Sequence, residues 1–247
     1  MKMNSISADL NLMIKAATKA SKVLIRDFGE IEKLQVSLKG PSDFVTNADL
    51  KVEKIIIDEL LKSKKKYSVI TEESGKIQTS DNVNCWIIDP IDGTINFLHG
   101  VPHFAVSIAL KKKDEIIAGV VYDPIKDEMF YAEKNNGAYL NNKRIKVSKK
   151  NNLIDCLLAT GNKYEQNNLT TRNMGCAALD MAYVAAGRFD GYFQDKLNLW
   201  DLAAGIILVN EAGGKINNIN INKIENIKIL ATNNSIYEKM LKKLNNF

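Results

Sequence analysis

One stretch constrains the fold more than any other: an apolar run that ends in two closely spaced carboxylates. Residues 85–89 read Cys-Trp-Ile-Ile-Asp and are followed by Pro-Ile-Asp-Gly-Thr. The apolar part is typical of a buried strand. Asp, Pro and Gly at these positions predict a tight turn, which brings its first and last Cα atoms within about 7 Å. We therefore expect the turn to aim the carboxylates of Asp89 and Asp92, and the Ile91 carbonyl, in one direction.

Two further acidic motifs stand at the ends of predicted elements. Glu72-Glu73 follows a strand-type run over residues 67–71, and Asp201 opens a helical stretch over 201–212. Two ionised carboxylates about 5 Å apart repel by roughly 3 kcal/mol at an effective dielectric constant near 20. None of the three acidic motifs contains Lys or Arg, so either protonation or a bound cation must relieve this repulsion. Oxygen ligands without His or Cys suit a hard divalent ion, Mg²⁺ before Mn²⁺.

Gly93 and Thr94 follow the acidic turn and precede a helix expected to begin at Asn96–Phe97. Backbone N–H groups at the start of a helix favour a phosphate. Metal ions beside a phosphate-binding segment indicate phosphoryl hydrolysis.

Each of these residues also has a purely structural interpretation, and only their joint occurrence at successive strand ends favours a metal site. The only two histidines, His99 and His103, are expected to be packing or loop residues rather than metal ligands. Asp201 would be an N-cap, Asp89 and Asp92 turn formers, and Glu72 and Glu73 part of a solvated loop. Thr94 would be a helix cap, and Asp49 an acidic residue in the first turn of its helix.

The order of predicted elements indicates a layered α/β fold in a single catalytic unit, residues 1–247, with halves of about 1–148 and 149–247. Three central strands form an antiparallel meander rather than βαβ units. Helices are expected over 10–28, 48–62, 177–186 and 201–212, and from 235. Strands are expected over 67–71, 85–89, 105–110, 116–122, 128–132, 156–160, 188–193 and 227–231.

Composition sets the outer limits on function. No run of about 20 apolar residues occurs, and the first residues lack a signal-peptide pattern, so neither a membrane span nor secretion is expected. Three cysteines without CxxC spacing are expected to be reduced and buried, as in the cytoplasm. The net charge of +5 comes from scattered Lys runs, which we interpret as solvated loops. Without Arg clusters or interleaved aromatics, nucleic-acid binding stays a minor hypothesis.

Taken together and in order, the motifs closely resemble the inositol monophosphatases over almost the whole chain. The stretch WIIDPIDGTINF at 86–97 is the most specific of them. The others are Val45–Asp49 with Lys51–Lys54, Thr71–Gly75, and Trp200–Gly205 with Glu211–Gly214.

The resemblance implies an α/β (α+β) fold of the αβαβα sandwich type found in sugar and inositol phosphatases. It also implies a homodimer, two to three Mg²⁺ ions, lithium sensitivity, and hydrolysis of myo-inositol monophosphate or a similar small monoester by a metal-activated water. The matching metal positions are Glu72, Asp89, the Ile91 carbonyl, Asp92 and Asp201. The matching catalytic positions are Asp49, Glu72 and Thr94. The matching substrate positions are Glu72, Ile91, Asp92, Gly93, Thr94, Gly175, Ala177, Gln194 and Asp201.

Two departures from the family pattern bear on the choice of substrate. Gln194 stands where the family often has a Glu that contacts substrate hydroxyls, so the charge is lost while Asp195 lies next to it. The connection between Gly161 and Arg172 is short, whereas the family typically has a longer one with a helix. That shortening is expected either to open the rim of the active site or to alter the dimer contact.

Several rival functions remain open. A phosphatase of the same superfamily would act on 3′-phosphoadenosine 5′-phosphate (a 3′(2′),5′-bisphosphate nucleotidase), on fructose bisphosphate, or on histidinol phosphate. A protein of a different class would bind RNA or RNA polymerase in transcription or RNA processing. Two readings fail: a haloacid-dehalogenase-type phosphatase needs a DxD spacing, and an EF-hand needs a twelve-residue ligand loop.

Overall fold

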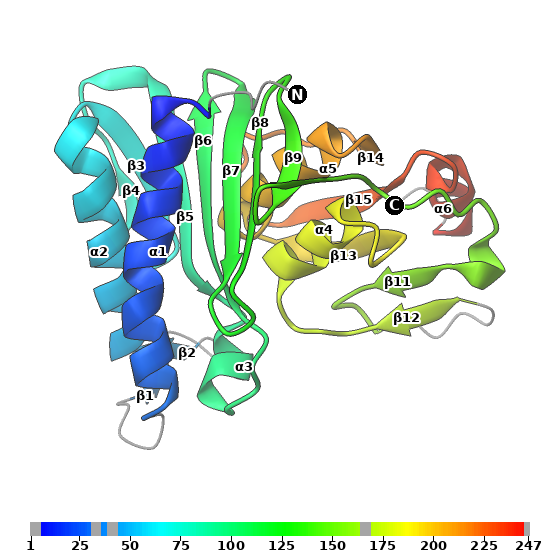
Figure 1. The fold of residues 1–247 in the computed structure, drawn as a ribbon, viewed down its shortest axis with the longest axis horizontal. Helices are drawn as coiled ribbons and strands as arrows, with labels where there is room; N and C mark the ends of the chain where they lie inside the picture. The colour runs from blue at the N-terminus through cyan, green and yellow to red at the C-terminus, as the bar shows by residue number, and fades with distance from the viewer. Residues whose placement is uncertain (1–5, 31–35, 39–43, 164–168, 245–247) are drawn as a thin grey trace.

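The computed structural model describes residues 6–30, 36–38, 44–163 and 169–244. Most of these residues belong to two β-sheets and the helices that cover them (Figure 1). Two short strands, β1 (Val36–Leu38) and β2 (Phe44–Thr46), form a separate antiparallel pair at the base of the helical layer.

The larger sheet has eight strands in the order β10-β9-β8-β7-β6-β5-β3-β4. β3 and β5 run parallel and every other pair is antiparallel, so the predicted meander of β6, β7 and β8 is confirmed. The strands are β3 (Tyr67–Thr71), β4 (Gly75–Ile77), β5 (Asp81–Asp92), β6 (Ala105–Lys112), β7 (Glu115–Asp123), β8 (Glu128–Glu133), β9 (Gly137–Leu140) and β10 (Lys143–Ile145).

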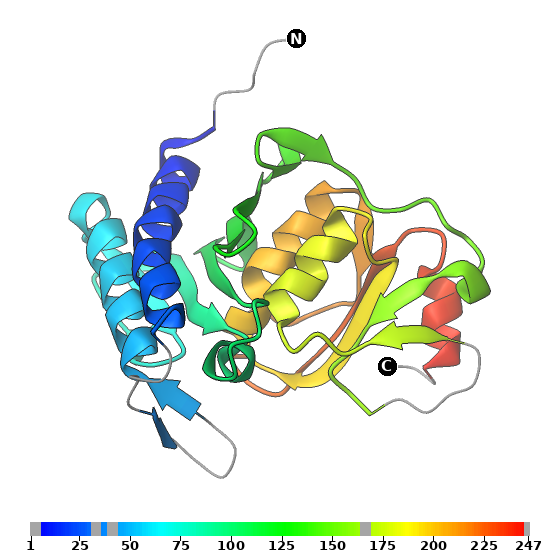
Figure 2. The ribbon, with the colours of Figure 1, turned by 60° about the horizontal axis from the view of Figure 1, so that its bottom comes forward.

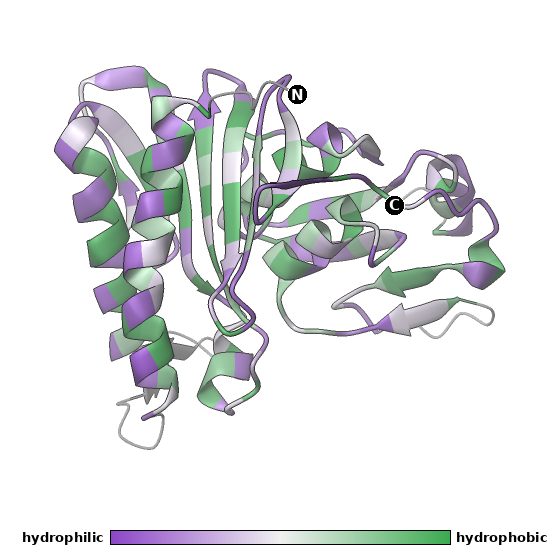
Figure 3. Cartoon of the chain, viewed as in Figure 1, coloured by the Kyte–Doolittle hydropathy of each residue, from purple (hydrophilic) through white to green (hydrophobic). Residues whose placement is uncertain are grey.

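Two long helices, α1 (Ala8–Phe28) and α2 (Asn47–Ser63), cover one face of this sheet (Figure 1). The Ser7 hydroxyl caps α1 by accepting a hydrogen bond from the Leu10 N–H at 3.1 Å, and the helix ends at Gly29. Apolar side chains at helical spacing, including Met13 and Leu24, are fully buried against the sheet. Hydrophilic and hydrophobic residues alternate along both helices (Figure 3).

The smaller sheet has five strands, β12-β11-β13-β15-β14, and the helices α4 and α5 lie between the two sheets (Figure 2). The two helices pack closely, since a Cβ on Gly205 of α5 would lie 2.6 Å from the Cβ of Met181 on α4. The bounds are β11 (Leu157–Ala159), β12 (Thr170–Arg172), α4 (Ala177–Ala185), β13 (Gly191–Leu197), α5 (Leu199–Glu211), β14 (Gly214–Ile216) and β15 (Ile227–Asn233).

The last helix, α6 (Tyr237–Lys243), covers the outer face of the smaller sheet, where Tyr237 and Met240 are buried with Phe193 and Leu230. The layers therefore run helix, sheet, helix, sheet, helix, and the predicted αβαβα sandwich is confirmed. The division of the chain near residue 148 stays a prediction. All three cysteines lie in the described part and are unpaired; Cys156 and Cys176 are buried and Cys85 partly so.

Several predicted boundaries were wrong, mostly because pairing with a neighbouring strand extends an element beyond its apolar run. β5 continues to Asp92 rather than ending at Asp89, and β13 lies over 191–197 rather than 188–193. The short helix α3 (Thr94–Leu98) begins two residues earlier than expected. Within the described residues, no helix is both long enough and apolar enough to cross a bilayer.

Candidate active site

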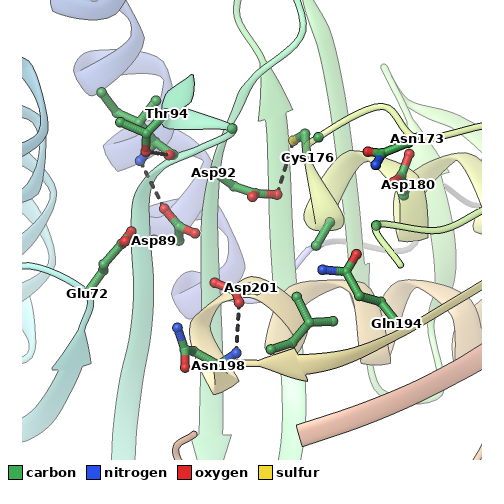
Figure 4. A pocket seen from close by; sticks show the side chains of 16 residues that line it. Glu72, Asp89, Asp92, Thr94, Asn173, Cys176, Asp180, Gln194, Asn198 and Asp201 are labelled. Atoms are coloured by element: carbon green, nitrogen blue, oxygen red, sulfur yellow. Dashed lines mark hydrogen bonds between the residues drawn. The ribbon is translucent and has the colours of Figure 1, made fainter. Parts of the chain in front are cut away.

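A cavity of about 340 Å³ opens where the C-terminal ends of β3 and β5 meet the N-terminal ends of α4 and α5 (Figure 4). Four carboxylates predicted as metal ligands line it, and they come from three separate parts of the chain. The cavity is lined by Glu72, Asp89, Ile91, Asp92, Gly93, Thr94, Gly161, Asn173, Gly175, Cys176, Ala177, Asp180, Gln194, Leu197, Asn198 and Asp201. Ten of the eleven predicted site residues are in this lining.

Asp89 and Asp92 are carried by a β-bulge, not by the predicted tight turn. Asp89 pairs with Ser107 and Asp92 with Ala105, so one extra residue is inserted in β5. Pairing with β6 keeps this segment extended, which the local Asp-Pro pattern could not reveal. The Ile91 N–H donates to the Asp89 carboxylate at 3.0 Å, and the Thr94 hydroxyl donates to the Ile91 carbonyl at 2.9 Å.

Gly93 follows the bulge in a left-handed conformation, with φ of 92°. A Cβ at this position would lie 3.1 Å from the His103 carbonyl oxygen and 3.3 Å from both the Cys176 Cβ and the Gly175 carbonyl oxygen. The backbone therefore turns from β5 into α3 in a space that fits only glycine.

We expect Gly93→Ala to destabilise the protein by more than the roughly 1–2 kcal/mol cost of the left-handed conformation alone. Gly100→Ala is the matched control, because Gly100 also has a positive φ, 69°, but its Cβ would meet nothing within 4 Å. Chemical unfolding of both variants measures the difference, which isolates the crowding around Gly93. Equal losses of stability would contradict this account.

The turn that carries Glu72 is held by a buried acid that sequence reasoning did not single out. The Glu53 carboxylate on α2 is 2% exposed. It accepts hydrogen bonds from the Thr71 hydroxyl at 2.7 Å, the Glu73 N–H at 3.0 Å and the Ser74 N–H and hydroxyl. The sequence did contain a signal for this role of Glu53, because an acidic residue stands on the apolar face of the helix predicted over 48–62.

Asp92 links the two halves of the site. Its carboxylate accepts a hydrogen bond from the Ala178 N–H at 2.5 Å and from the Cys176 thiol at 3.0 Å, both at the start of α4 (Figure 4). Asp201 lies in the first turn of α5, and its carboxylate accepts from the Asn198 N–H at 2.8 Å. The N-cap of α5 is Asn198, so the N-cap interpretation of Asp201 was wrong.

Asp49 is the one predicted catalytic residue outside the cavity lining. It is fully buried in the first turn of α2, and its charge contributes to the raised pKa of Asp89. The structure thus brings Asp49 close to the carboxylate cluster without exposing it to the cavity.

The histidines are not part of the cavity lining. Burial lowers the pKa of His103 to about 4, and its ring packs against Tyr183 with centroids 5.9 Å apart. His99 is exposed at the end of α3.

Gly175, Ala177 and Gln194 line the cavity, and Figure 4 shows Gln194 on the side away from Glu72. The Asn96 side chain donates to the carbonyls of His103 and Met174, each at 2.8 Å, and so ties the Gly175 segment to α3. Residues 164–168 of the short connection lie outside the described part. The described end of this connection is strand β12, which pairs in parallel with β11.

The carboxylates strongly disfavour being charged together. Burial raises the pKa of Asp89 well above its usual range, and the charges of Glu72, Asp92, Asp201 and Asp49 raise it further. Burial likewise raises the pKa of Asp201 well above its usual range, with Asp92 contributing, and burial raises that of Asp92. A cation bound among them would favour the charged carboxylates and so oppose all three shifts.

The donor set fits a hard divalent cation chemically, because it consists of carboxylate and carbonyl oxygens. In the described part of the chain, no three Asp, Glu, His or Cys side chains are already arranged around one point to hold an ion. The carboxylates of Asp89, Asp92 and Asp201 each accept a hydrogen bond from a nearby backbone N–H.

Comparisons with known proteins agree with the fold and the cavity. Residues 7–246 match the family model described as "Inositol monophosphatase family". The chain is 48% identical to an inositol-1-monophosphatase of Rhizobium meliloti, with 84% of each chain covered. It is 42% identical to the Nus factor SuhB of Escherichia coli K12, with 83% of each covered. A crystal structure of the extragenic suppressor protein suhB of Bartonella henselae superposes with a TM-score of 0.91 at 46% identity, covering 96% of this chain and 98% of that one.

The family match, together with the layered fold and the carboxylate-lined cavity, identifies the chain as a phosphoric monoester hydrolase, of a family that is generally metal-dependent. The chain belongs to the inositol monophosphatase family. The predicted family and enzyme class are confirmed, whereas the roles of the individual site residues stay predictions.

Proposed function

We propose that the protein is a Mg²⁺-dependent phosphatase that hydrolyses myo-inositol monophosphate or a closely similar small phosphate monoester. The observation that carries this is the convergence of Glu72, Asp89, Asp92 and Asp201 on one cavity beside the Gly93–Thr94 backbone. A volume of about 340 Å³ is at the lower end of the range for ligand pockets, about 300–1,000 Å³. The small volume favours a monoester over a nucleotide bisphosphate.

Glu72, Asp89, the Ile91 carbonyl, Asp92 and Asp201 would hold two to three Mg²⁺ ions. Bound Mg²⁺ supplies Lewis-acid activation of a water and neutralises charge on the phosphoryl group. Thr94, whose hydroxyl donates to the Ile91 carbonyl, orients the attacking water, and the buried Asp49 acts indirectly from behind the cavity wall. The backbone at Gly93 and Thr94 approaches the phosphate closely because Gly93 has no side chain. No protein nucleophile is required, so displacement is in line and leaves no phospho-enzyme.

Four substrates test this proposal: inositol 1-phosphate, 3′-phosphoadenosine 5′-phosphate, fructose 1,6-bisphosphate and histidinol phosphate. Phosphate release with Mg²⁺ and with EDTA is measured for each. We expect inositol 1-phosphate to have the highest kcat/KM, and EDTA to abolish release. Preference for another ester would retain the mechanism and change the substrate. No release from any ester, with Mg²⁺ binding demonstrated, would contradict the enzymatic proposal.

A binding role in transcription is the second candidate, favoured by the 42–44% identity to proteins named Nus factor SuhB and by the net charge of +5. Salt-sensitive binding to RNA or RNA polymerase that survives Asp92→Asn would support it. The complete set of carboxylates supports the enzyme as the primary function. Homodimer formation, lithium sensitivity and a cytoplasmic location stay predictions.

A further inference from the structure

Asp180 is a buried carboxyl in the cavity that the proposed mechanism does not use. It lies in the first turn of α4, is 2% exposed and lines the cavity. Figure 4 shows it with Asn173 and Gln194 on the side of the cavity away from Glu72 and Asp89. Considering the described residues alone, the Asp180 Oδ1 atom has no hydrogen-bond partner in the protein.

A buried polar atom without a partner is rare and costly, so its position in a cavity wall points to a ligand group. The phosphate of the substrate is not this group, because the proposed function places it beside the Gly93–Thr94 backbone. Glu72 and Asp89, two of the proposed Mg²⁺ ligands, lie on the other side of the cavity (Figure 4), so a cation held there is not the partner of Asp180 either. A hydroxyl group fits, because it donates one hydrogen bond to a carboxyl oxygen. Burial and the charge of Asp92 raise the pKa of Asp180 well above its usual range, so an uncharged ligand suits it further.

Gln194 supplies complementary chemistry on the same side of the cavity. The Tyr192 hydroxyl donates to the Gln194 Oε1 at 2.8 Å, which leaves the amide N–H groups as donors. The side chain occupies this position only because residue 161 is glycine, since a Cβ there would lie 2.1 Å from Oε1. One wall thus carries an acceptor and a donor, and a hydroxyl both donates and accepts.

We propose that Asp180 is a specificity-determining residue that accepts a hydrogen bond from a substrate hydroxyl remote from the phosphate, with Gln194 as the complementary donor. The substrate class is then a phosphate monoester of a polyol, with hydroxyls on the carbons away from the ester. This inference rests on the proposed phosphatase function and adds a residue that recognises the alcohol part of the ester.

The test compares two substrates of similar shape, myo-inositol 1-phosphate and cyclohexyl phosphate, which lacks the hydroxyls. The variants are Asp180→Leu, which keeps the approximate size without polar atoms, and Asp180→Asn, which keeps an acceptor oxygen. Tyr183→Phe is the control on the same helix, because Tyr183 packs against Phe130 and Phe189, away from the cavity.

We expect Asp180→Leu to lower the ratio of the two kcat/KM values, inositol ester over cyclohexyl ester, by about tenfold, mainly through KM. Asp180→Asn should retain the ratio within about threefold, and Tyr183→Phe should leave it unchanged. The Ki of free myo-inositol as a product inhibitor should rise in Asp180→Leu, whereas the Ki of inorganic phosphate should not. Thermal unfolding of each variant checks the fold.

An unchanged ratio in a folded Asp180→Leu protein would overturn the inference, as would an equal loss on both substrates. If Asp180→Leu does not fold, Asp180→Ala takes its place in the same assay. Failure of the phosphatase function itself has a different signature, because the unmodified protein would then release phosphate from neither ester.

Discussion

Asp92→Asn is expected to reduce Mg²⁺-dependent phosphate release by at least about 100-fold, since second-shell changes alone cost about 10–100-fold in metal sites. Asp92 stands between the carboxylates on β5 and the start of α4, and burial already disfavours its charge. The Asn side chain is uncharged, so it lacks the negative charge with which Asp92 would bind a cation. Asn keeps an acceptor oxygen for the Ala178 N–H, so the fold should persist.

Activity as a function of Mg²⁺ concentration, together with direct calorimetric Mg²⁺ binding, checks this expectation. The control is Asp190→Asn. Asp190 is a buried carboxylate that accepts from the Ser148 hydroxyl at 2.5 Å and the Leu157 N–H at 2.7 Å, outside the cavity lining. Its replacement should lower stability without changing the affinity for Mg²⁺. Full activity of Asp92→Asn would remove Asp92 from the proposed ligands.

Asp89→Asn is expected to have opposite effects on activity and on stability. In the metal-free protein it removes the cost of keeping a buried carboxyl protonated at a pH where the unfolded chain ionises it, so the free energy of unfolding at neutral pH should rise by about 1 kcal/mol or more. The Ile91 N–H retains an acceptor in the amide oxygen. Activity should be lost, because one proposed Mg²⁺ ligand is gone.

The pH dependence of stability follows from the same shifts. The folded-state pKa values of Asp89, Asp92 and Asp201 are raised, so the metal-free folded protein holds protons that the unfolded chain releases. The stability from these groups is complete below the unfolded pKa of about 4 and is lost as the pH rises through the raised folded values.

Denaturant unfolding across this pH range, in EDTA and in Mg²⁺, measures the effect. Mg²⁺ binds the ionised carboxylates, so its stabilisation should grow with pH and reach about 2.7 kcal/mol at 100 times its Kd. Asp89→Asn should flatten the metal-free pH profile. Identical profiles for Asp89→Asn and the unmodified protein would show that this carboxyl does not titrate as inferred.

Much of the fold could be predicted from sequence because apolar periodicity reports burial directly. The helices α1 and α2 and the meander β6–β8 were predicted within a few residues, since each buries a regular pattern. Strands β4, β9, β10, β12 and β14 were not predicted. They are three or four residues long, too short to show a period, and depend on pairing with a neighbour.

The sequence by itself determined the chemistry of the site: which carboxylates are present, and that glycine and threonine follow them. Only the tertiary structure decided how those groups are aimed. Pairing with β6 turned the expected turn at Asp89–Asp92 into a bulge, and Glu53 fixed the turn that carries Glu72. Folding also buried Asp180 in the cavity wall. The physical reason is that residue identity sets charge and hydrogen-bonding capacity locally, whereas direction and burial depend on partners distant in the chain.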